Sequence, residues 1–109
     1  MFNFQIFNFQ NMSNFTRALS KISVDLDLSF DNSGDQLEQL SFYLNELINR
    51  DFNAVVQILY RMDVSEAKVR EKLANPLPGE TAGSILAHLL IQREMEKMKW
   101  REQFKNGEL

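Results

Sequence analysis

The sequence predicts an all-α protein: a three- to four-helix bundle with an extended N-terminal segment. Leucine, isoleucine and valine recur at helical spacing over residues 36–49, 52–62 and 80–104. Aspartates that can cap a helix precede the first two of these stretches, and a proline-containing segment precedes the third. The chain has 109 residues, 44% of them hydrophobic and 25% charged, which suits one globular domain with a modest core.

Residues 1–21 are predicted to be a flexible N-terminal extension, followed by a single helical domain over residues 22–105 and a tail over residues 106–109. Residues 2–5 and 7–10 repeat the sequence Phe-Asn-Phe-Gln, an uncharged composition typical of a sticky β-segment. Met12 is a second plausible start, so residues 1–11 are either such an arm or a start-site artefact. Residues 22–30 alternate apolar and polar side chains, which predicts an extended strand that packs on the helices or pairs across a dimer.

The first predicted helix spans residues 36–49, with Asp35 as its N-cap and Glu38 at capping-box spacing. Its expected buried stripe is Leu37, Leu40, Leu44, Leu47 and Ile48. Asp51 is expected to cap the second helix, residues 52–62. The residues expected to be buried there are Phe52, Val55, Val56 and Leu59.

The third predicted helix, residues 64–74, is short and is expected to be capped by Asp63 and stopped by Pro76. Its expected buried residues are Val64 or Ala67, Val69 and Leu73. The last helix is expected to start near Glu80 and Thr81 and to reach Phe104. Its apolar stripe is dense at first and then thins among charges, which predicts that residues 93–105 overhang the globule.

Residues 58–73 resemble the Val-Ser-x-x-Thr-Val core of bacterial helix-turn-helix regulators, since Val64, Ser65 and Val69 occupy its positions. The resemblance implies that DNA would be contacted by Ser65, Lys68, Arg70 and Lys72. The chain departs from that pattern at Leu59, at Asp63 and at Lys68 itself, which replaces the threonine. A net charge of −3 also argues against broad binding to phosphate backbones, so nucleic acid is not the favoured partner.

Residues 36–105 as a whole resemble small helical proteins of bacterial genomes that have no assigned activity. The resemblance is carried by the run from Arg50-Asp51-Phe52 to Arg61-Met62-Asp63-Val64-Ser65 and by the charged last helix. It implies an α-helical fold and no functional residues.

Several kinds of chemistry have no support in the sequence. The chain has no cysteine, so disulfides, thiol catalysis and thiolate metal sites are excluded. The acidic run that includes Asp31 fails the spacing of a calcium loop, and the single histidine, His88, has no carboxylate at helical spacing to orient it. We therefore expect no enzyme activity, catalytic residue, cofactor or metal. No apolar run reaches membrane-spanning length, and the cytoplasm is the expected location.

The expected function is protein–protein interaction through the last helix, either with a second copy as a homodimer or with another protein. Methionine and aromatic side chains, which are enriched at protein interfaces, recur near the C-terminal end of this helix. The candidate interface residues are Met95, Met98, Trp100 and Phe104. Two alternatives stay open: residues 22–30 or the N-terminal arm of the same chain cover this helix, or residues 58–73 read DNA.

Overall fold

The computed structural model describes residues 13–31 and 33–105, and within those ranges it contains five helices and no strand. The helices are α1 (Asn14–Asp25), α2 (Gln36–Arg50), α3 (Phe52–Arg61), α4 (Glu66–Ala74) and α5 (Ala82–Lys105). The all-α prediction is confirmed. The described part of the chain has five helices rather than three to four, because α1 forms where an extended segment was expected.

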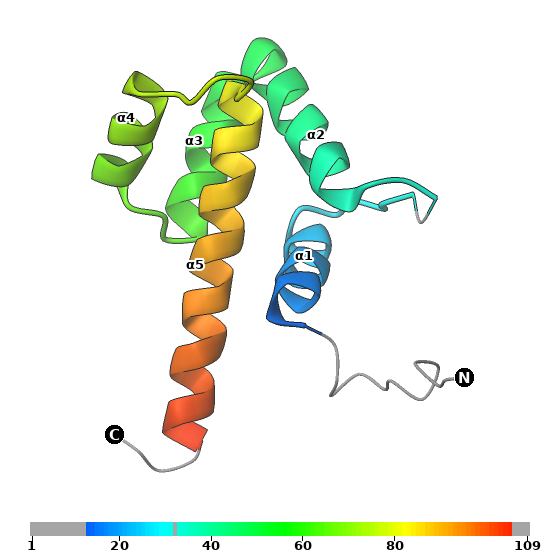
Figure 1. Ribbon diagram of the computed structural model, residues 1–109, viewed down its shortest axis with the longest axis vertical. Coiled ribbons are helices and arrows are strands. Elements are labelled where there is room, and N and C mark those ends of the chain that lie inside the picture. Colours follow the sequence, from blue (N-terminus) through cyan, green and yellow to red (C-terminus); the bar gives the residue numbers. More distant parts are fainter. Residues whose placement is uncertain (1–12, 32, 106–109) are drawn as a thin grey trace.

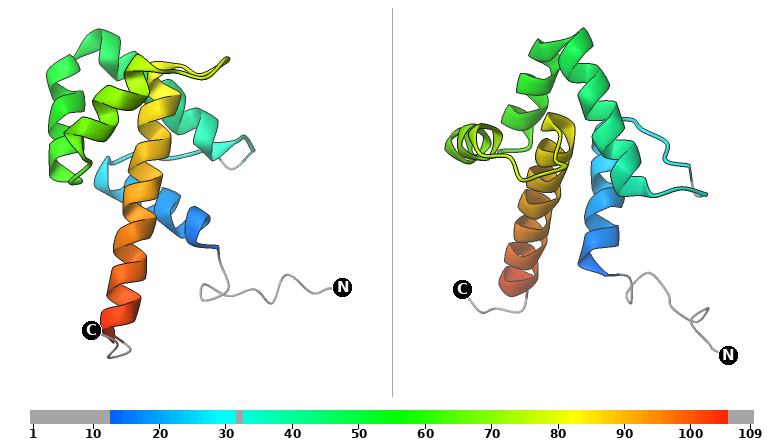
Figure 2. Two further views of the ribbon diagram at one scale, coloured as in Figure 1. Left: turned by 60° about the vertical axis from the view of Figure 1, so that its left-hand side comes forward. Right: turned by 45° about the horizontal axis from the view of Figure 1, so that its top comes forward.

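The long helix α5 is the central element of the fold. In Figure 1, α1 and α2 lie on one side of it and α3 and α4 on the other, and the right-hand view of Figure 2 agrees. α2 makes the most extensive contact with α5, while α1 and α4 also pack against it. The fully buried aliphatic side chains include Ile22 of α1, Leu40 and Leu44 of α2, Val55 of α3 and Leu90 of α5. One core therefore joins helices from both sides of α5.

The predicted strand over residues 22–30 is wrong, since its first four residues belong to α1. The Ser13 hydroxyl accepts a hydrogen bond from the Thr16 amide at 3.1 Å and caps this helix. Ala18, Leu19 and Ile22 are buried, and Val24, which a strand would have buried beside Ile22, is 74% exposed. The predicted boundary between residues 21 and 22 thus falls inside a packed helix, and residues 14–21 are not a flexible extension. Residues 1–11 and 106–109 lie outside the described residues.

The alternating pattern that suggested a strand is in part a helix C-terminus. Asp27 adopts a left-handed backbone (φ 57°), and the Leu28 amide donates to the Ser23 carbonyl at 2.8 Å, which is the Schellman arrangement. α3 ends in the same way: Asp63 has φ 61° and the Val64 amide donates to the Leu59 carbonyl at 3.0 Å. An apolar-Asp-apolar triplet therefore closes both helices.

The start of α2 and that of α3 follow the sequence prediction. The Asp35 carboxylate accepts from the Leu37 amide at 2.9 Å, and the Asp51 carboxylate accepts from the Ala54 amide at 3.2 Å. Both capping predictions are confirmed. In α2 the residues Leu40, Leu44 and Leu47 are buried, as expected.

The orientation of α3 differs from the prediction. Val55 and Ile58 face the core, whereas Phe52 is 61% exposed and Val56 is 47% exposed. Together with Tyr60, at 88% exposed, these two residues are spaced four apart and so form a second, outward apolar stripe. α3 is apolar on two sides. The side that packs in the core is the one with Val55 and Ile58, which leads to the buried Met62.

The start of α4 also differs, because its N-cap is Ser65 rather than Asp63. The Ser65 hydroxyl accepts from the Lys68 amide at 3.3 Å, while Asp63 is held in the left-handed turn described above. Val64 and Val69 are partly buried against the core, Leu73 is 39% exposed, and no residue of α4 is fully buried. α4 is therefore a surface helix attached by two valines.

A polar contact joins α2 to the start of α5. The Asn45 side chain accepts from the Gly83 amide at 2.8 Å and donates to the Thr81 hydroxyl at 3.0 Å. The backbones approach closely here, since a Cβ atom on Gly83 would clash with the Ser41 carbonyl oxygen of the α2 backbone; it would also lie 2.6 Å from the Asn45 side-chain carbon Cγ. This crossing fixes the N-terminal end of α5, and with it the direction in which its C-terminal half projects.

Candidate functional site

The C-terminal half of α5 extends past α3 and α4 (Figure 1). The predicted overhang over residues 93–105 is correct only for part of this segment. Glu94 is buried, and Met95 and Met98 are partly buried against the core. Trp100 and Phe104 are 59% and 72% exposed. α1 packs on one side of α5, but it consists of residues 14–25 rather than the segment 22–30 that was expected to cover this helix, and it leaves Trp100 and Phe104 exposed.

The four candidate interface residues point in three directions. Met98 lines a groove against α1, and Met95 lines a shallow hollow beside Lys68 and Gln92. Trp100 lines a third depression with Lys97 and Arg101. Phe104 follows Trp100 by four residues and so lies on the same side of the helix. Trp100 and Phe104 form one surface, which Met95 and Met98 do not share.

Trp100 and Phe104 continue a row of side chains along one side of α5, and the row is buried nearer the start of the helix. Phe104 follows Leu86 by 18 residues, which is about five turns at 3.6 residues per turn. Leu86 and Leu90 in that row are buried, whereas Trp100 and Phe104 are exposed. We call the side chains of Lys97, Trp100 and Phe104 the bare face of α5. Its apolar character is that of a core-facing stripe, but none of the described helices covers it.

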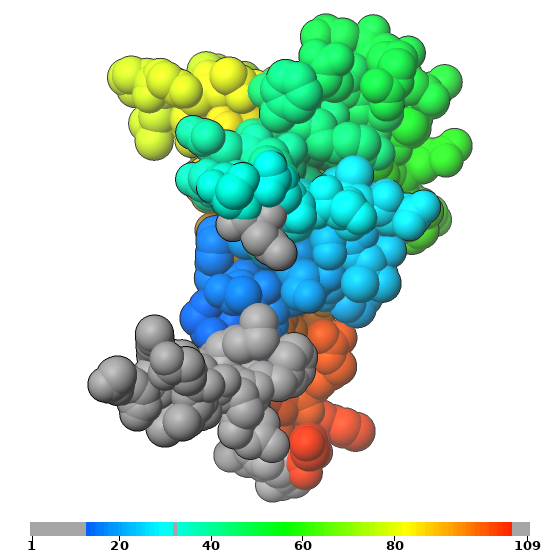
Figure 3. All heavy atoms as spheres, turned by 90° about the vertical axis from the view of Figure 1, so that its right-hand side faces the viewer, coloured from blue at the N-terminus to red at the C-terminus, as the bar shows by residue number. Residues whose placement is uncertain are grey.

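A second surface combines aromatic side chains with acidic ones. The loop before α2 and the first turns of α2 form a hollow of about 430 Å³, lined by Leu28, Phe30, Phe42, Tyr43 and Glu38 among others. Phe42 is 68% exposed there. Residues 22–49 carry six acidic side chains and no Lys or Arg. Figure 3 shows this segment on one face of the molecule, with the end of α5 below it. We call this hollow the acidic aromatic hollow.

The structure places the candidate DNA-contacting residues on and just before α4. Ser65 caps the helix with its hydroxyl, and Arg70 pairs with Glu66 at 3.3 Å. Lys68 and Lys72 are exposed. Their positive charge is partly offset, since the same helix carries Glu66 and Glu71.

The turn before α4 is tied to α5 by Arg93. Its guanidinium donates from Nε to the Asp63 carbonyl at 3.0 Å and from Nη2 to the Asp63 carboxylate at 2.9 Å. It also donates from Nη1 to Glu96 at 3.0 Å. The hydrogen bond to Asp63, followed by that to Glu96, raises the pKa of Arg93 above its ordinary value. The charged Arg93 thus holds the α3–α4 turn against the middle of α5.

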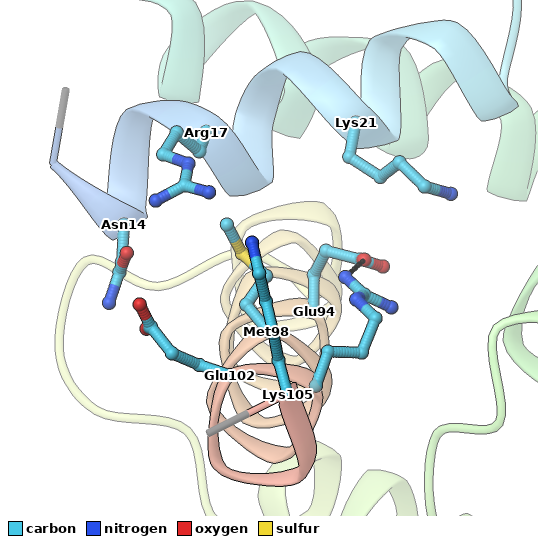
Figure 4. A pocket seen from close by; sticks show the side chains of 8 residues that line it. Asn14, Arg17, Lys21, Glu94, Met98, Glu102 and Lys105 are labelled. Atoms are coloured by element: carbon cyan, nitrogen blue, oxygen red, sulfur yellow. Dashed lines mark ion pairs between the residues drawn. The ribbon is translucent and has the colours of Figure 1, made fainter. Parts of the chain in front are cut away.

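A charged groove lies between the first half of α1 and the last half of α5 (Figure 4). Its volume is about 290 Å³. From α1 it is lined by Asn14, Arg17 and Lys21, and from α5 by Glu94, Met98, Arg101, Glu102 and Lys105. In Figure 4 the Arg17 side chain points from α1 toward α5, and Lys105 extends from α5 toward α1. Basic side chains of two helices therefore converge on one space.

Glu94 is the buried charge of this groove. Its side chain is 2% exposed, and its Oε2 atom has no hydrogen-bond partner. Arg101 Nη2 lies 3.6 Å from that oxygen, which makes an ion pair but is too long for a hydrogen bond. The groove is not apparent from the predicted elements, because Asn14, Arg17 and Lys21 share a face only if residues 14–21 are helical. Helical spacing of these three residues was the available signal.

The remaining features of the described residues offer little chemistry. His88 is exposed, and its Nδ1 lies 2.8 Å from the carbonyl of Ser84, one turn earlier. Residues 13–31 and 33–105 contain no group of three or more His, Cys, Asp and Glu that could hold a metal ion. In the same ranges, every helix is too short or too polar to cross a membrane.

Comparisons with protein-family models, with curated proteins and with solved structures found no match to this chain. The two resemblances described above therefore rest only on the residues quoted for them.

Proposed function

We propose that this chain is a non-enzymatic interaction protein that self-associates through the bare face of α5. The observation that carries the proposal is the row from Leu86 to Phe104. Its first part is buried by the rest of the fold, and its last part exposes a tryptophan and a phenylalanine four residues apart. Aromatic side chains of this kind dominate the energetics of protein interfaces.

The size of the bare face sets the expected strength of association. Burying the exposed parts of Trp100 and Phe104 is worth roughly 3 kcal/mol each at about 25 cal/mol per Å². Association costs about 4 kcal/mol or more in lost translational and rotational freedom. These two residues alone leave a net gain of about 2 kcal/mol, and the apolar surface of the receiving copy adds to it. The sum supports weak association, with a dissociation constant in the high micromolar to millimolar range, rather than an obligate dimer.

Charge complementarity supports a second copy as the partner. Lys97 and Arg101 flank Trp100, so the aromatic surface of α5 has a basic border. The acidic aromatic hollow offers the opposite combination, with Phe42 exposed beside Glu38 in a segment without basic residues. Opposite charges around apolar centres favour encounter and fix register. The bare face of one copy can thus bind in the acidic aromatic hollow of another.

The test is sedimentation velocity of the full chain over roughly 0.01 to 1 mM. Trp100→Glu places a charge at the centre of the bare face and should weaken association by about tenfold or more. Tyr60→Glu is the matched control, because Tyr60 is an even more exposed aromatic residue on α3, outside the bare face. It should leave association unchanged. A wild-type chain that stays monomeric, or an equal effect of both variants, would overturn the proposal.

DNA reading by α4 is the second candidate. Its support is that α4 begins directly after Ser65, which caps it, and that Lys68 and Lys72 are exposed on it. It ranks second because α4 carries Glu66 and Glu71 among its three basic residues, and phosphates repel these carboxylates.

A further inference from the structure

The groove between α1 and α5 contains a buried acceptor without a donor. Glu94 is almost fully buried, yet its Oε2 accepts no hydrogen bond. A buried polar atom left in this state costs about 1–3 kcal/mol, and more when it is charged. The ion pair with Arg101 at 3.6 Å offsets part of the charge but supplies no hydrogen bond. A donor from a bound molecule would remove that cost.

The rim of the groove has the opposite chemistry. Arg17, Arg101 and Lys105 bring three positive charges to it, and Glu102 is the acidic residue among them. Lys21 also lines the groove but pairs with Asp25 at 2.8 Å. Guanidinium and ammonium groups together are the usual ligands of a carboxylate or phosphate.

These two features select one class of ligand. A simple anion would meet the rim favourably but would be repelled by the buried Glu94. A simple amine would satisfy Glu94 but would be repelled by the rim. We propose that the groove binds a small zwitterion, whose ammonium donates to Glu94 and whose oxyanion contacts Arg17, Arg101 and Lys105. The volume of about 290 Å³ lies at the lower end for ligand sites, which suits a molecule of amino-acid size.

The site differs from the surface proposed for self-association, although Arg101 borders both. The other groove residues of α5 include Met98 and Glu102 on the α1 side, whereas the bare face is formed by Lys97, Trp100 and Phe104. Either proposal can fail without the other, because the groove is tested by ligand shifts and the bare face by molecular mass.

The experiment is an NMR titration of the ¹⁵N-labelled full chain with four small probes. O-phosphoethanolamine and β-alanine carry an ammonium with a phosphate or a carboxylate, and so distinguish the two sources of the oxyanion. Ethyl phosphate and ethylamine each carry one of the two charges. We expect amide shifts at Arg17, Met98 and Arg101, with at least one zwitterion binding about tenfold tighter than either single-charge probe.

Variants separate the two halves of the site. Glu94→Gln should lower zwitterion affinity about tenfold or more and should not weaken ethyl phosphate binding. Lys105→Gln, an exposed change that keeps the test usable if Glu94→Gln does not fold, should weaken the zwitterion and ethyl phosphate together. Lys72→Gln on α4 is the matched control and should change nothing. Ethyl phosphate binding as tightly as both zwitterions, no shift with any probe, or unchanged zwitterion binding in Glu94→Gln would each overturn the proposal.

Discussion

Single residues set how closely the helices of this bundle approach one another. Gly83 lies against α2, where Asn45 accepts a hydrogen bond from its amide. The same asparagine donates to Thr81, so one side chain satisfies two polar groups at the start of α5. A glycine in a helix normally costs stability, and here the close approach of α2 and α5 explains it. Sequence alone could not show this, because the partner lies 38 residues away.

Replacing Gly83 with alanine should destabilise the protein despite the better helix propensity of alanine. The new Cβ would clash with the Ser41 carbonyl oxygen of the α2 backbone and would lie 2.6 Å from Asn45 Cγ, so α2 and α5 must move apart. We expect the free energy of unfolding to fall by about 1–3 kcal/mol, measured by urea denaturation. A rise in stability, which helix propensity alone would give, would show that the two backbones are not in close contact.

For whole helices and strands, the sequence predicts the element correctly where the spacing of apolar residues fits only one type of secondary structure. Residues 36–50 and 82–91 have helical spacing with no competing pattern, and α2 and α5 form close to the predicted bounds. Residues 22, 26 and 30 are four apart, a spacing that fits both a strand repeat and about one helical turn. Burial of Ala18 and Leu19 in the tertiary structure favours the helix. That information lies outside the alternating segment, which is why α1 was missed.

The shared ending of α1 and α3 gives a matched prediction. Asp27 and Asp63 both adopt a left-handed backbone, which glycine adopts without the steric cost of a Cβ atom. Asp63 also forms an ion pair with Arg93. Asp27→Gly should therefore raise the free energy of unfolding by about 0.5 kcal/mol. Asp63→Gly should gain less or lose stability, because it removes the pair. Thermal unfolding measures both variants against the wild type. A larger gain in stability for Asp63→Gly than for Asp27→Gly would contradict the expected roles of the two aspartates.

At the scale of the whole molecule, charge and apolar surface are distributed unevenly. Residues 22–49 carry six acidic and no basic residues, whereas Lys97, Lys99, Arg101 and Lys105 lie at the end of α5. The sequence predicted that this helix exposes Trp100 and Phe104, because apolar residues thin out there among charges. It could not predict that Met98 turns toward α1 or that Glu94 becomes buried, since both depend on where α1 crosses α5. The acidic aromatic hollow and the groove between α1 and α5 thus become apparent only in the folded chain.

This charge distribution predicts which charge-reversed variants of the chain associate with each other. Lys97→Glu makes the border of the bare face acidic, and Glu38→Lys makes the acidic aromatic hollow more basic. Each variant alone should self-associate about two- to fivefold more weakly than the wild type, as expected for one exposed charge pair. An equimolar mixture should form heteromers more tightly than either variant forms homomers. In the heteromer, the carboxylate introduced on the bare face of one chain faces the ammonium introduced in the hollow of the other.

Fluorescence-detected sedimentation with one labelled variant measures this preference. It should weaken as salt is raised from about 0.05 to 0.5 M, because exposed charges are screened over shorter distances. Lys72→Glu, a charge reversal on α4 away from both surfaces, is the matched control and should pair with Glu38→Lys no more tightly than it pairs with itself. If the Lys97→Glu and Glu38→Lys mixture shows no preference for heteromers, the acidic aromatic hollow is not the receptor for the bare face. Association that also survives Trp100→Glu would place the contact elsewhere on the molecule.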